Sequence, residues 1–336
     1  SPHRPGREAK AAVEVAREQV GGLFPPGGAL LFTSGATEAA NLAIKGAAWA
    51  APPGRTRIVT LATEHACVLD STRWLGARGF EAVVLPVEPD GLVDLDRLAR
   101  AVDGRTLLVA AMLVNNEIGV VQPVAEIGRI ARAAGALFFC DAVQGFGRMA
   151  LPAADLIAVS AHKLHGPKGV GALWMRAGVA LEPLMHGGAQ EGGLRSGTLS
   201  PALCAGFGAA VAVAQTRMAA DAAYVKALWA RAQDRLEGWT LNGSARQRYH
   251  GNLNLRREGL DAARLMADAR TVAFSAGSAC ASGSGRPSHV LTALGLTERE
   301  ARASIRLGFG RDTTAQELDD GLALILAAAE RQRAFA

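Results

Sequence analysis

The chain has 336 residues, of which 49% are hydrophobic and 20% are charged, and its formal net charge is +5 at pH 7. A chain of this length and composition can bury a sizeable core and suits a large domain joined to a smaller one. The basic residues are scattered, no apolar run reaches the ~18 residues of a membrane-spanning helix, and nothing near the start resembles a secretory signal. Neither nucleic-acid binding nor membrane insertion is therefore predicted, and a cytoplasmic location is expected.

The cysteines show no paired spacing and no CxxC motif. In a chain of this size, that pattern indicates reduced thiols and argues against a disulfide framework or a zinc site. The four residues are Cys67, Cys140, Cys204 and Cys280.

The first part of the chain predicts a helix, a strand and a turn. Apolar residues recur at helical spacing from Arg7 to Val20, and a short strand is expected from Leu30 to Thr33. The strand breaks into the turn Ser34 to Thr37, which precedes a second helix. Backbone N–H groups at such a helix start bind phosphate well, but the same residues also form an ordinary helix cap. The turn alone does not decide between these two interpretations.

Strand-like and helical runs then alternate, which is typical of an α/β fold with a mostly parallel sheet. The strands are continuous apolar runs, as expected when helices cover both faces of a sheet. Strands are predicted at 57–62, 82–87, 106–113, 137–141, 156–160 and 171–175, and helices at 67–78, 95–102 and 124–134.

Polar residues follow several of these strands. In an open α/β sheet, ligands bind beyond the carboxyl ends of the strands, so these residues are candidates for a site. They are Glu64 and His65, Asn115 and Asn116, and Asp141 and Gln144.

Lys163 lies in the stretch VSAHKLHGPKGVG, directly after a predicted buried strand. We expect this lysine on the buried side, where desolvation lowers the pKa of an amine and makes it a nucleophile. A neutral lysine forms Schiff bases with carbonyl compounds. The alternative is a lysine that extends past the sheet to water.

The last part of the chain begins with the glycine-rich stretch GGAQEGGLRSGTLSP, where the backbone is expected to approach a ligand or partner. A long alanine-rich helix follows, from about Ala202 to Leu236. A smaller α+β unit is predicted after it, with strands near 252–255 and 272–275 and a helix near 262–267.

Asp141, Lys163 and the turn Ser34 to Thr37 together supply the groups that pyridoxal phosphate needs: an acid for the pyridinium nitrogen, a lysine for the aldehyde and donors for the phosphate. At this point the sequence resembles the cysteine desulfurases of the NifS and IscS type, which are class V, fold-type I pyridoxal phosphate enzymes. The matching stretches are TSGATEAANLAIKG, TEHACVL, VNNEIGVVQPVAEIG, FFCDAVQ, SAHKLHGPKGVGALW, EGGLRSGTL, SAGSACASG and SIRLGFGR.

The resemblance implies a large cofactor-binding α/β domain over residues 1–215, with a mostly parallel seven-stranded sheet. It also implies a small α+β domain over 216–336, on which the leading helix is able to pack. It further implies roles for individual residues. Lys163 would bond to the cofactor aldehyde and move the substrate's Cα proton, His65 would stack on the ring and assist proton transfer, and Arg306 would clamp the substrate carboxylate. The other cofactor contacts implied are Asp141 and Gln144 on the ring, Asn116 near the ring and substrate, and Ala36, Thr37, Ser160, His162 and the neighbouring subunit's Thr198 on the phosphate.

Cys280 is the expected nucleophile because it lies in a run of small residues without periodicity, which predicts an exposed loop. The resemblance implies that it takes sulfur from L-cysteine as a persulfide, leaving alanine. Cys67, Cys140 and Cys204 fit core packing. Cys67 lies two residues after His65, but we expect the two side chains to diverge on a helix.

The resemblance also implies a homodimer and a protein acceptor for the sulfur, such as an iron–sulfur scaffold or a thiolation enzyme. Relatives begin with an ATTP-like segment before the point where this chain starts, and often have Thr and Ser where this chain has Val143 and Gly145. Other readings remain: a selenocysteine lyase, a class V aminotransferase, or a sulfur-delivery partner that is catalytically impaired. The alternative for Arg306 is a surface ion pair.

Overall fold

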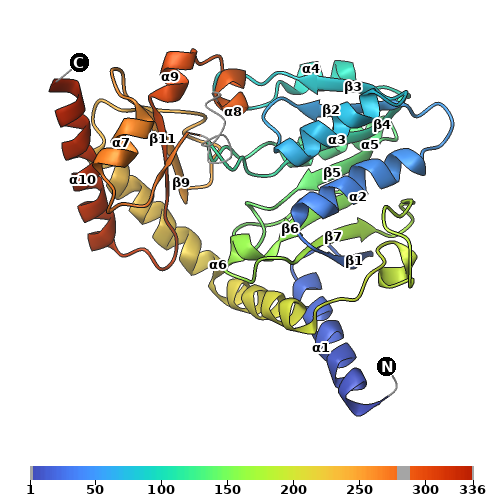
Figure 1. Cartoon of the computed structure of the whole chain (residues 1–336). Helices are drawn as coiled ribbons and strands as arrows, with labels where there is room; N and C mark the ends of the chain where they lie inside the picture. The colour runs from blue at the N-terminus through green and yellow to red at the C-terminus, as the bar shows by residue number, and fades with distance from the viewer. Residues whose placement is uncertain (1–2, 278–287, 335–336) are drawn as a thin grey trace. The chain divides into compact units, whose positions relative to one another are not determined.

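The computed structural model of the chain describes residues 3–277 and 288–334 (Figure 1). It divides into two compact units. The first contains residues 1–85, 94–113 and 123–218. The second contains 219–336 together with two short earlier segments, 86–93 and 114–122, so its boundary is crossed several times by the chain. The polar pair Asn115 and Asn116 belongs to the second unit.

The first unit is built on a seven-stranded sheet with the strand order β1-β7-β6-β5-β4-β2-β3. Five strands, from β6 to β3 along this order, are parallel, and β7 runs antiparallel to both of its neighbours. The predicted mostly parallel sheet is confirmed. The strands are β1 (Gly28–Thr33), β2 (Arg57–Leu61), β3 (Glu81–Leu85), β4 (Thr106–Met112), β5 (Leu137–Asp141), β6 (Leu156–Ser160) and β7 (Gly171–Arg176).

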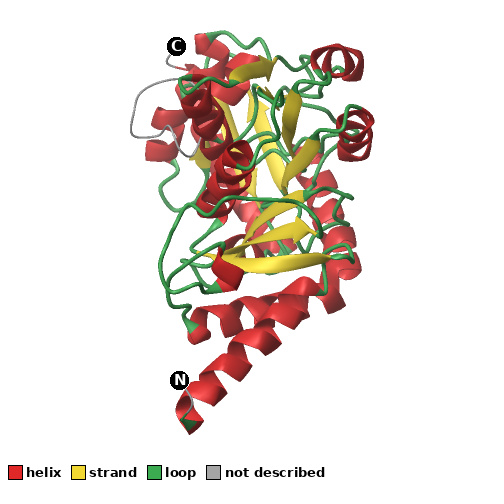
Figure 2. Ribbon diagram, turned by 90° about the vertical axis from the view of Figure 1, so that its right-hand side faces the viewer, coloured by secondary structure: helices red, strands yellow, loops and turns green. Residues whose placement is uncertain are grey.

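Helices flank the strands of this unit (Figure 2). Helix α2 packs on the central strands and on α3, while α5 packs on β4, β5 and α4. The alanine-rich sequence of α2 leaves little side-chain bulk, so this helix approaches the sheet closely and buries eight of its residues. The helices are α1 (Arg4–Gly21), α2 (Ala36–Trp49), α3 (Ala66–Gly76), α4 (Leu95–Ala101), α5 (Val124–Ala133) and the start of α6 (Pro201–Arg235).

The register of the sheet brings the ends of β1 and β6 together. Gly171, the first residue of β7, pairs with Thr33 at the end of β1 on one side and with Ser160 at the end of β6 on the other. A Cβ atom at Gly171 would lie 2.6 Å from the Val159 oxygen and 2.7 Å from the Gly35 Cα. Only glycine therefore allows the turn after β1 to reach the end of β6.

The second unit holds a four-stranded antiparallel sheet in the order β10-β11-β9-β8. Its apolar core includes residues of β9, β11, α7 and α10. A strand was expected near 272–275, but the structure has only a two-residue strand, Ser275–Ala276, which overlaps the end of that range, and irregular backbone at 272–274. The elements are β8 (Thr240–Leu241), β9 (Asn252–Arg256), α7 (Ala262–Asp268), β10 (Ser275–Ala276), α8 (His289–Ala293), α9 (Glu298–Arg302), β11 (Ser304–Gly308) and α10 (Ala315–Ala334).

Helix α6 is 35 residues long and apolar. Among the described helices it alone has the length and composition to cross a membrane, with a window of mean hydropathy 1.2 that is 28% buried. The core helix of a soluble protein passes the same test, so this is weak evidence for a membrane span. At Gly208, a Cβ atom would lie 3.0 Å from the Ala16 Cα, which shows how closely α6 packs against α1 within the first unit.

Candidate active site

The acid predicted for the site, Asp141, is the last residue of β5 and is only 6% exposed. Its Oδ1 accepts a hydrogen bond from the Val143 backbone N–H at 3.0 Å. Burial raises the pKa of Asp141, while the Val143 hydrogen bond and the nearby charge of His65 act in the opposite direction. A buried acid at a strand end, held by one backbone donor, is suited to pair with a cationic ring nitrogen because such a partner would favour its ionised form.

His65 lies at the N-cap of α3, where its Nδ1 accepts the Cys67 backbone N–H at 3.2 Å. The Nδ1 atom is also 3.1 Å from the Cys67 Sγ. The expectation that these two side chains diverge was wrong, because His65 precedes the helix and its side chain folds back over the first turn. The pair is nevertheless not a thiolate and its base: burial, followed by the charges of Asp141 and Glu64, raises the Cys67 pKa far above its usual value.

The other described cysteines are also unsuited to nucleophilic attack. Burial raises the pKa of Cys140 and of Cys204, and both residues lie in the core. Cys280 lies outside the described residues. Its role as nucleophile stays a prediction, made from the sequence.

Lys163 follows β6 in a short 3-10 helix, Ala161–Leu164. Ala161 and Leu164 are buried, whereas His162 and Lys163 are exposed. The expectation of a buried lysine was therefore wrong, because the tight helical turn directs its two middle residues away from the sheet. The turn leaves the side chain of Lys163 accessible at the carboxyl end of the strand that neighbours β5.

Ser160 and His162 form a polar pair at the end of β6, with 2.8 Å between the Ser160 Oγ and the His162 Nδ1. Partial desolvation and the charges of Lys163 and Lys168 lower the pKa of His162. In the tautomer that donates from Nδ1 to Ser160, the hydroxyl proton of Ser160 remains available for an anion. This arrangement suits the predicted phosphate contact.

Gln144 is oriented by an arginine that sequence reasoning missed. The Nη1 atom of Arg148 donates to the main-chain oxygen of Gln144 at 3.0 Å and to its Oε1 at 3.2 Å. The Nη2 atom donates to the main-chain oxygen of Lys163 at 2.7 Å. Because the amide oxygen of Gln144 is engaged, its NH₂ group is the part left to donate to a ligand. The spacing of four residues in QGFGR was the available signal.

The turn after β1 presents an open helix start. Gly35 is the N-cap of α2, and among the described residues no side chain caps this end. Ala36 is half-buried and Thr37 exposed, and the first backbone N–H groups of a helix have no acceptors within the helix. The first turn holds Glu38, whose Oε2 accepts the Ser34 backbone N–H at 2.8 Å. Gly171 pairs with Thr33, just before this helix start, and with Ser160, so Ser160 lies near the uncapped helix start. Such a helix start fits a phosphate group.

Thr198 is exposed and lies in the segment between the 3-10 helix Glu191–Gly193 and α6. In the second unit, the Nη1 atom of Arg306 donates to the main-chain oxygen of Asn116 at 2.8 Å, and the Nδ2 atom of Asn252 donates to the same oxygen at 3.2 Å. Arg306 therefore uses one nitrogen to hold Asn116. The structure brings these two predicted substrate residues together, and Arg306 forms no ion pair with any residue that the structure describes.

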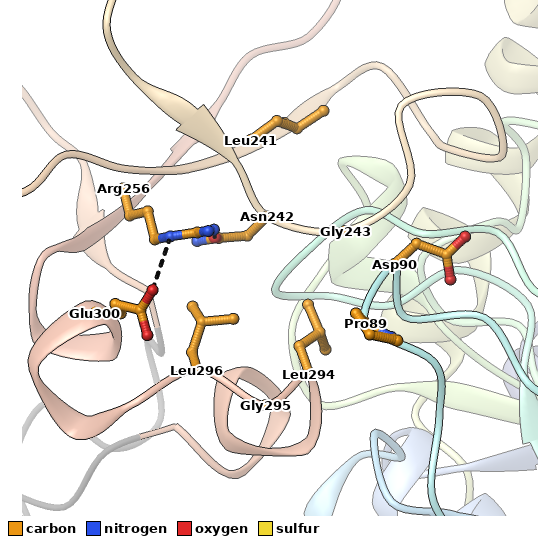
Figure 3. Close-up of a pocket in the computed structure, with 10 residues that line it drawn as sticks. All are labelled: Pro89, Asp90, Leu241, Asn242, Gly243, Arg256, Leu294, Gly295, Leu296 and Glu300. Carbon is orange, nitrogen blue, oxygen red and sulfur yellow. Dashed lines mark hydrogen bonds and ion pairs between the residues drawn. The ribbon is translucent and has the colours of Figure 1, made fainter.

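A cavity of about 430 Å³ lies in the second unit, with Arg256 and Glu300 on one side, 3.7 Å apart (Figure 3). Arg256 also donates to the Asn242 Oδ1, and the Glu300 carboxylate compensates its charge. None of the predicted site residues within 3–277 and 288–334 lines this cavity. Its residues are Pro89, Asp90, Leu241, Asn242, Gly243, Arg256, Leu294, Gly295, Leu296 and Glu300.

Comparisons with known proteins agree with this geometry. Residues 1–320 match the family model for class V aminotransferases. Over 347 aligned positions the chain is 43% identical to the cysteine desulfurase IscS of Rickettsia rickettsii, covering 99% of this chain and 84% of that protein. The chain belongs to the class V aminotransferase family, among the NifS/IscS-type cysteine desulfurases.

Solved structures of this family share the fold. A NifS-like protein superposes with a TM-score of 0.91 at 31% identity, covering 98% of this chain and 91% of that one. A structure described as SspA in complex with cysteine superposes with a TM-score of 0.78 at 32% identity, covering 92% and 89% of the two chains. The fold-type I architecture expected of a cysteine desulfurase is thereby confirmed.

Proposed function

We propose that the chain is a pyridoxal phosphate-dependent cysteine desulfurase that converts L-cysteine to L-alanine and keeps the sulfur as a persulfide on Cys280. The single observation that supports this most strongly is the set of groups that lie at one edge of the first unit's sheet. There a buried acid, Asp141, and the lysine-bearing turn at Lys163 end neighbouring parallel strands. An uncapped helix start lies across Gly171 from the second of these strands. Acid, amine and phosphate donors are the groups that this cofactor needs.

The residues of the first unit would hold the cofactor. The phosphate would bind the N–H groups of Ala36 and Thr37, with Ser160 and His162 opposite. Asp141 would hold the proton on the ring nitrogen, so that the ring acts as an electron sink when bound. Burial supports this role, because a carboxylate in a poorly hydrated place gains most from a cationic partner.

Two further side chains would act on the ring. Gln144 would donate from its NH₂ group to the ring oxygen, in the orientation that Arg148 imposes. His65 would cover the ring face, and its N-cap position restricts how far its side chain can turn.

The proton and sulfur steps would use the chain's own groups. Lys163 would take the proton from the substrate Cα through its amine, and Arg306, with Asn116, would bind the substrate carboxylate. The Cys280 thiolate would then attack the substrate sulfur, so that an S–S bond forms while the Cβ–S bond breaks. L-cysteine and the enzyme thiol give L-alanine and an enzyme persulfide, which balances all atoms.

A homodimer is part of this proposal. Thr198 is exposed in the single chain, where a second copy could use it. Val213 on α6 and Met185 are 48% and 43% exposed, and an apolar helix that is mostly unburied favours self-association. The sulfur acceptor would be another protein, such as an iron–sulfur scaffold or a thiolation enzyme, and reduced cysteines favour the cytoplasm.

The test is to incubate purified protein with pyridoxal phosphate and L-cysteine, and to measure alanine and sulfide. Equal amounts of the two are expected in the presence of a thiol reductant, and Cys280→Ala should lower sulfide release by about 100-fold or more, because the nucleophile is lost. Turnover that does not need Cys280 would instead indicate a selenocysteine lyase or an aminotransferase. A protein that binds no cofactor would be a delivery subunit.

A further inference from the structure

The glycine-rich segment that carries Thr198 is fixed at two points by arginine–glutamate pairs within the first unit. At the first point, Arg17 of α1 bonds Glu191 through Nη1 at 2.8 Å and Nη2 at 2.6 Å. The Glu191 Oε2 also accepts the Phe32 backbone N–H at 2.6 Å. Only 3% of the Glu191 side chain is exposed, so three charge-assisted bonds anchor the segment beside β1.

The second point is closer to Thr198. The Nε atom of Arg195 bonds the Glu38 Oε1 at 2.7 Å, and its Nη2 bonds Oε2 at 3.3 Å. The two side chains are 14% and 17% exposed. Burial alone would raise the pKa of Glu38, but hydrogen bonds from Arg195 and Ser34 outweigh it, and the Glu38 pKa lies below its usual value. The pair is therefore ionised at neutral pH.

Such pairs are weak evidence for stability, because the desolvation of two charges offsets most of their attraction. These two pairs are better explained as holding the segment in a backbone conformation that its own residues do not fix. Gly192, Gly193 and Gly197 all adopt positive φ, and Glu191 itself adopts φ 50°, a conformation that a non-glycine residue keeps only when its surroundings impose it.

Glu38 belongs to two structures at once. It lies in the first turn of α2 and accepts the N–H of Ser34, so it shapes the turn proposed to bind the phosphate of its own subunit. Through Arg195 it also holds the segment that ends in Thr198. One carboxylate thus fixes the two segments to each other.

We propose that Glu38 and Arg195 are positioning residues shared by the two cofactor sites of a dimer. In its own subunit Glu38 shapes the phosphate turn, and through Arg195 it sets the position of the Thr198 that the subunit presents to its partner's phosphate. This rests on the proposed function, because it needs a cofactor phosphate and a second copy. Its consequence is that the loss of Arg195 in one subunit weakens cofactor binding in the other.

The test uses mixed dimers with two affinity tags, isolated by sequential purification. One subunit carries Lys163→Ala and cannot bond the cofactor, and the other is unchanged. The absorbance band near ~420 nm that marks a lysine-bound cofactor then reports only the unchanged subunit's site. Titration with pyridoxal phosphate gives the dissociation constant of that one site.

Adding Arg195→Met to the Lys163→Ala subunit is expected to weaken binding at the unchanged site by about 5- to 10-fold, the effect of one lost hydrogen bond. Thr198→Ala in the same subunit should do the same. The matched control is Arg176→Met in that subunit. Arg176 pairs with the buried Asp155 at 2.6 Å in the same unit, and binding should stay within twofold.

Equal binding constants with and without Arg195→Met would overturn the proposal. So would a loss seen only when Arg195→Met is placed in the subunit whose own site is titrated. A failure of the proposed function looks different: the control dimer with Lys163→Ala alone would then show no band and release no sulfide from L-cysteine.

Discussion

Arg148 donates a hydrogen bond from its Nη2 to the main-chain oxygen of Lys163 at 2.7 Å, and so ties the catalytic candidate to the loop after β5. Its Nη1 is bonded at the same time to the main-chain and side-chain oxygens of Gln144. One guanidinium therefore sets the spacing between two residues that are expected to meet the same ring.

We predict that Arg148→Ala lowers kcat/KM for L-cysteine by about 10- to 100-fold, the usual effect of removing a residue that orients site groups. Pyridoxal phosphate binding should weaken as well. The control is Arg132→Ala, since Arg132 likewise bonds a main-chain oxygen, that of Ala153, at 2.9 Å. If both variants had the same activity, Arg148 would have no orienting role.

Gly171→Ala tests whether the turn after β1 must approach the end of β6. The new Cβ atom would meet backbone at 2.6 Å and 2.7 Å, which flexible side chains cannot relieve. We expect a loss of about 1–3 kcal/mol in the free energy of unfolding and a cofactor affinity reduced more than 10-fold. Gly104→Ala is the control, because nothing lies within 4 Å of its Cβ position. Urea denaturation and a cofactor titration on both variants decide the matter.

The architecture was predictable from the sequence, and so was the placement of candidate site residues at the strand ends. The strands of the first unit are continuous apolar runs and its helices carry apolar residues at helical spacing, and polar residues directly after buried strands indicated Asp141 and Lys163 as candidates. The side-chain directions were not predictable. His65 lies outside its helix, and the exposure of Lys163 depends on a single 3-10 turn.

Contacts between residues far apart in sequence were also missed. The predicted domain boundary near residue 215 placed 114–122 in the first domain, whereas the structure places this segment in the second unit. The ion pair of Glu38 with Arg195 spans 157 positions, and no local pattern indicates it. Such contacts form only when the whole unit packs, so local propensity and periodicity contain no information on them.

Asp141→Asn is expected to affect stability and activity differently. It should not destabilise the cofactor-free protein at neutral pH, but it should lower the activity. Burial raises the Asp141 pKa above its ordinary value of 3.8, so the folded chain binds this proton more tightly than the unfolded chain does. The stability of the cofactor-free protein therefore falls as the pH rises from about 3.8 through the folded-state pKa, and the loss is complete above it. The asparagine variant lacks this loss.

At pH 7 we expect cofactor-free Asp141→Asn to melt at the same temperature as the parent or about 1–3 °C higher. Its kcat should fall by roughly 10²- to 10³-fold, the effect of removing a preorganised electrostatic partner. Calorimetry and steady-state kinetics provide the two readings. A variant with full activity would show that Asp141 does not serve the ring.

Cys67→Ala tests whether the close contact between His65 and Cys67 has a catalytic purpose. Because burial keeps this thiol protonated, we expect kcat to change by less than about 3-fold, as for an inert packing cysteine. Thiol labelling with iodoacetamide should also miss Cys67 in the folded protein. A loss of activity comparable to that of Cys280→Ala would show that Cys280 had been wrongly assigned as the nucleophile.

The most direct test of the account is to identify the lysine that bonds the cofactor. The protein is loaded with pyridoxal phosphate, reduced with borohydride to make the bond permanent, digested and analysed by mass spectrometry. We expect a pyridoxyl group on Lys163 and none on Lys168, and no label when L-cysteine is added before reduction. A label on any other lysine, or on none, would contradict it.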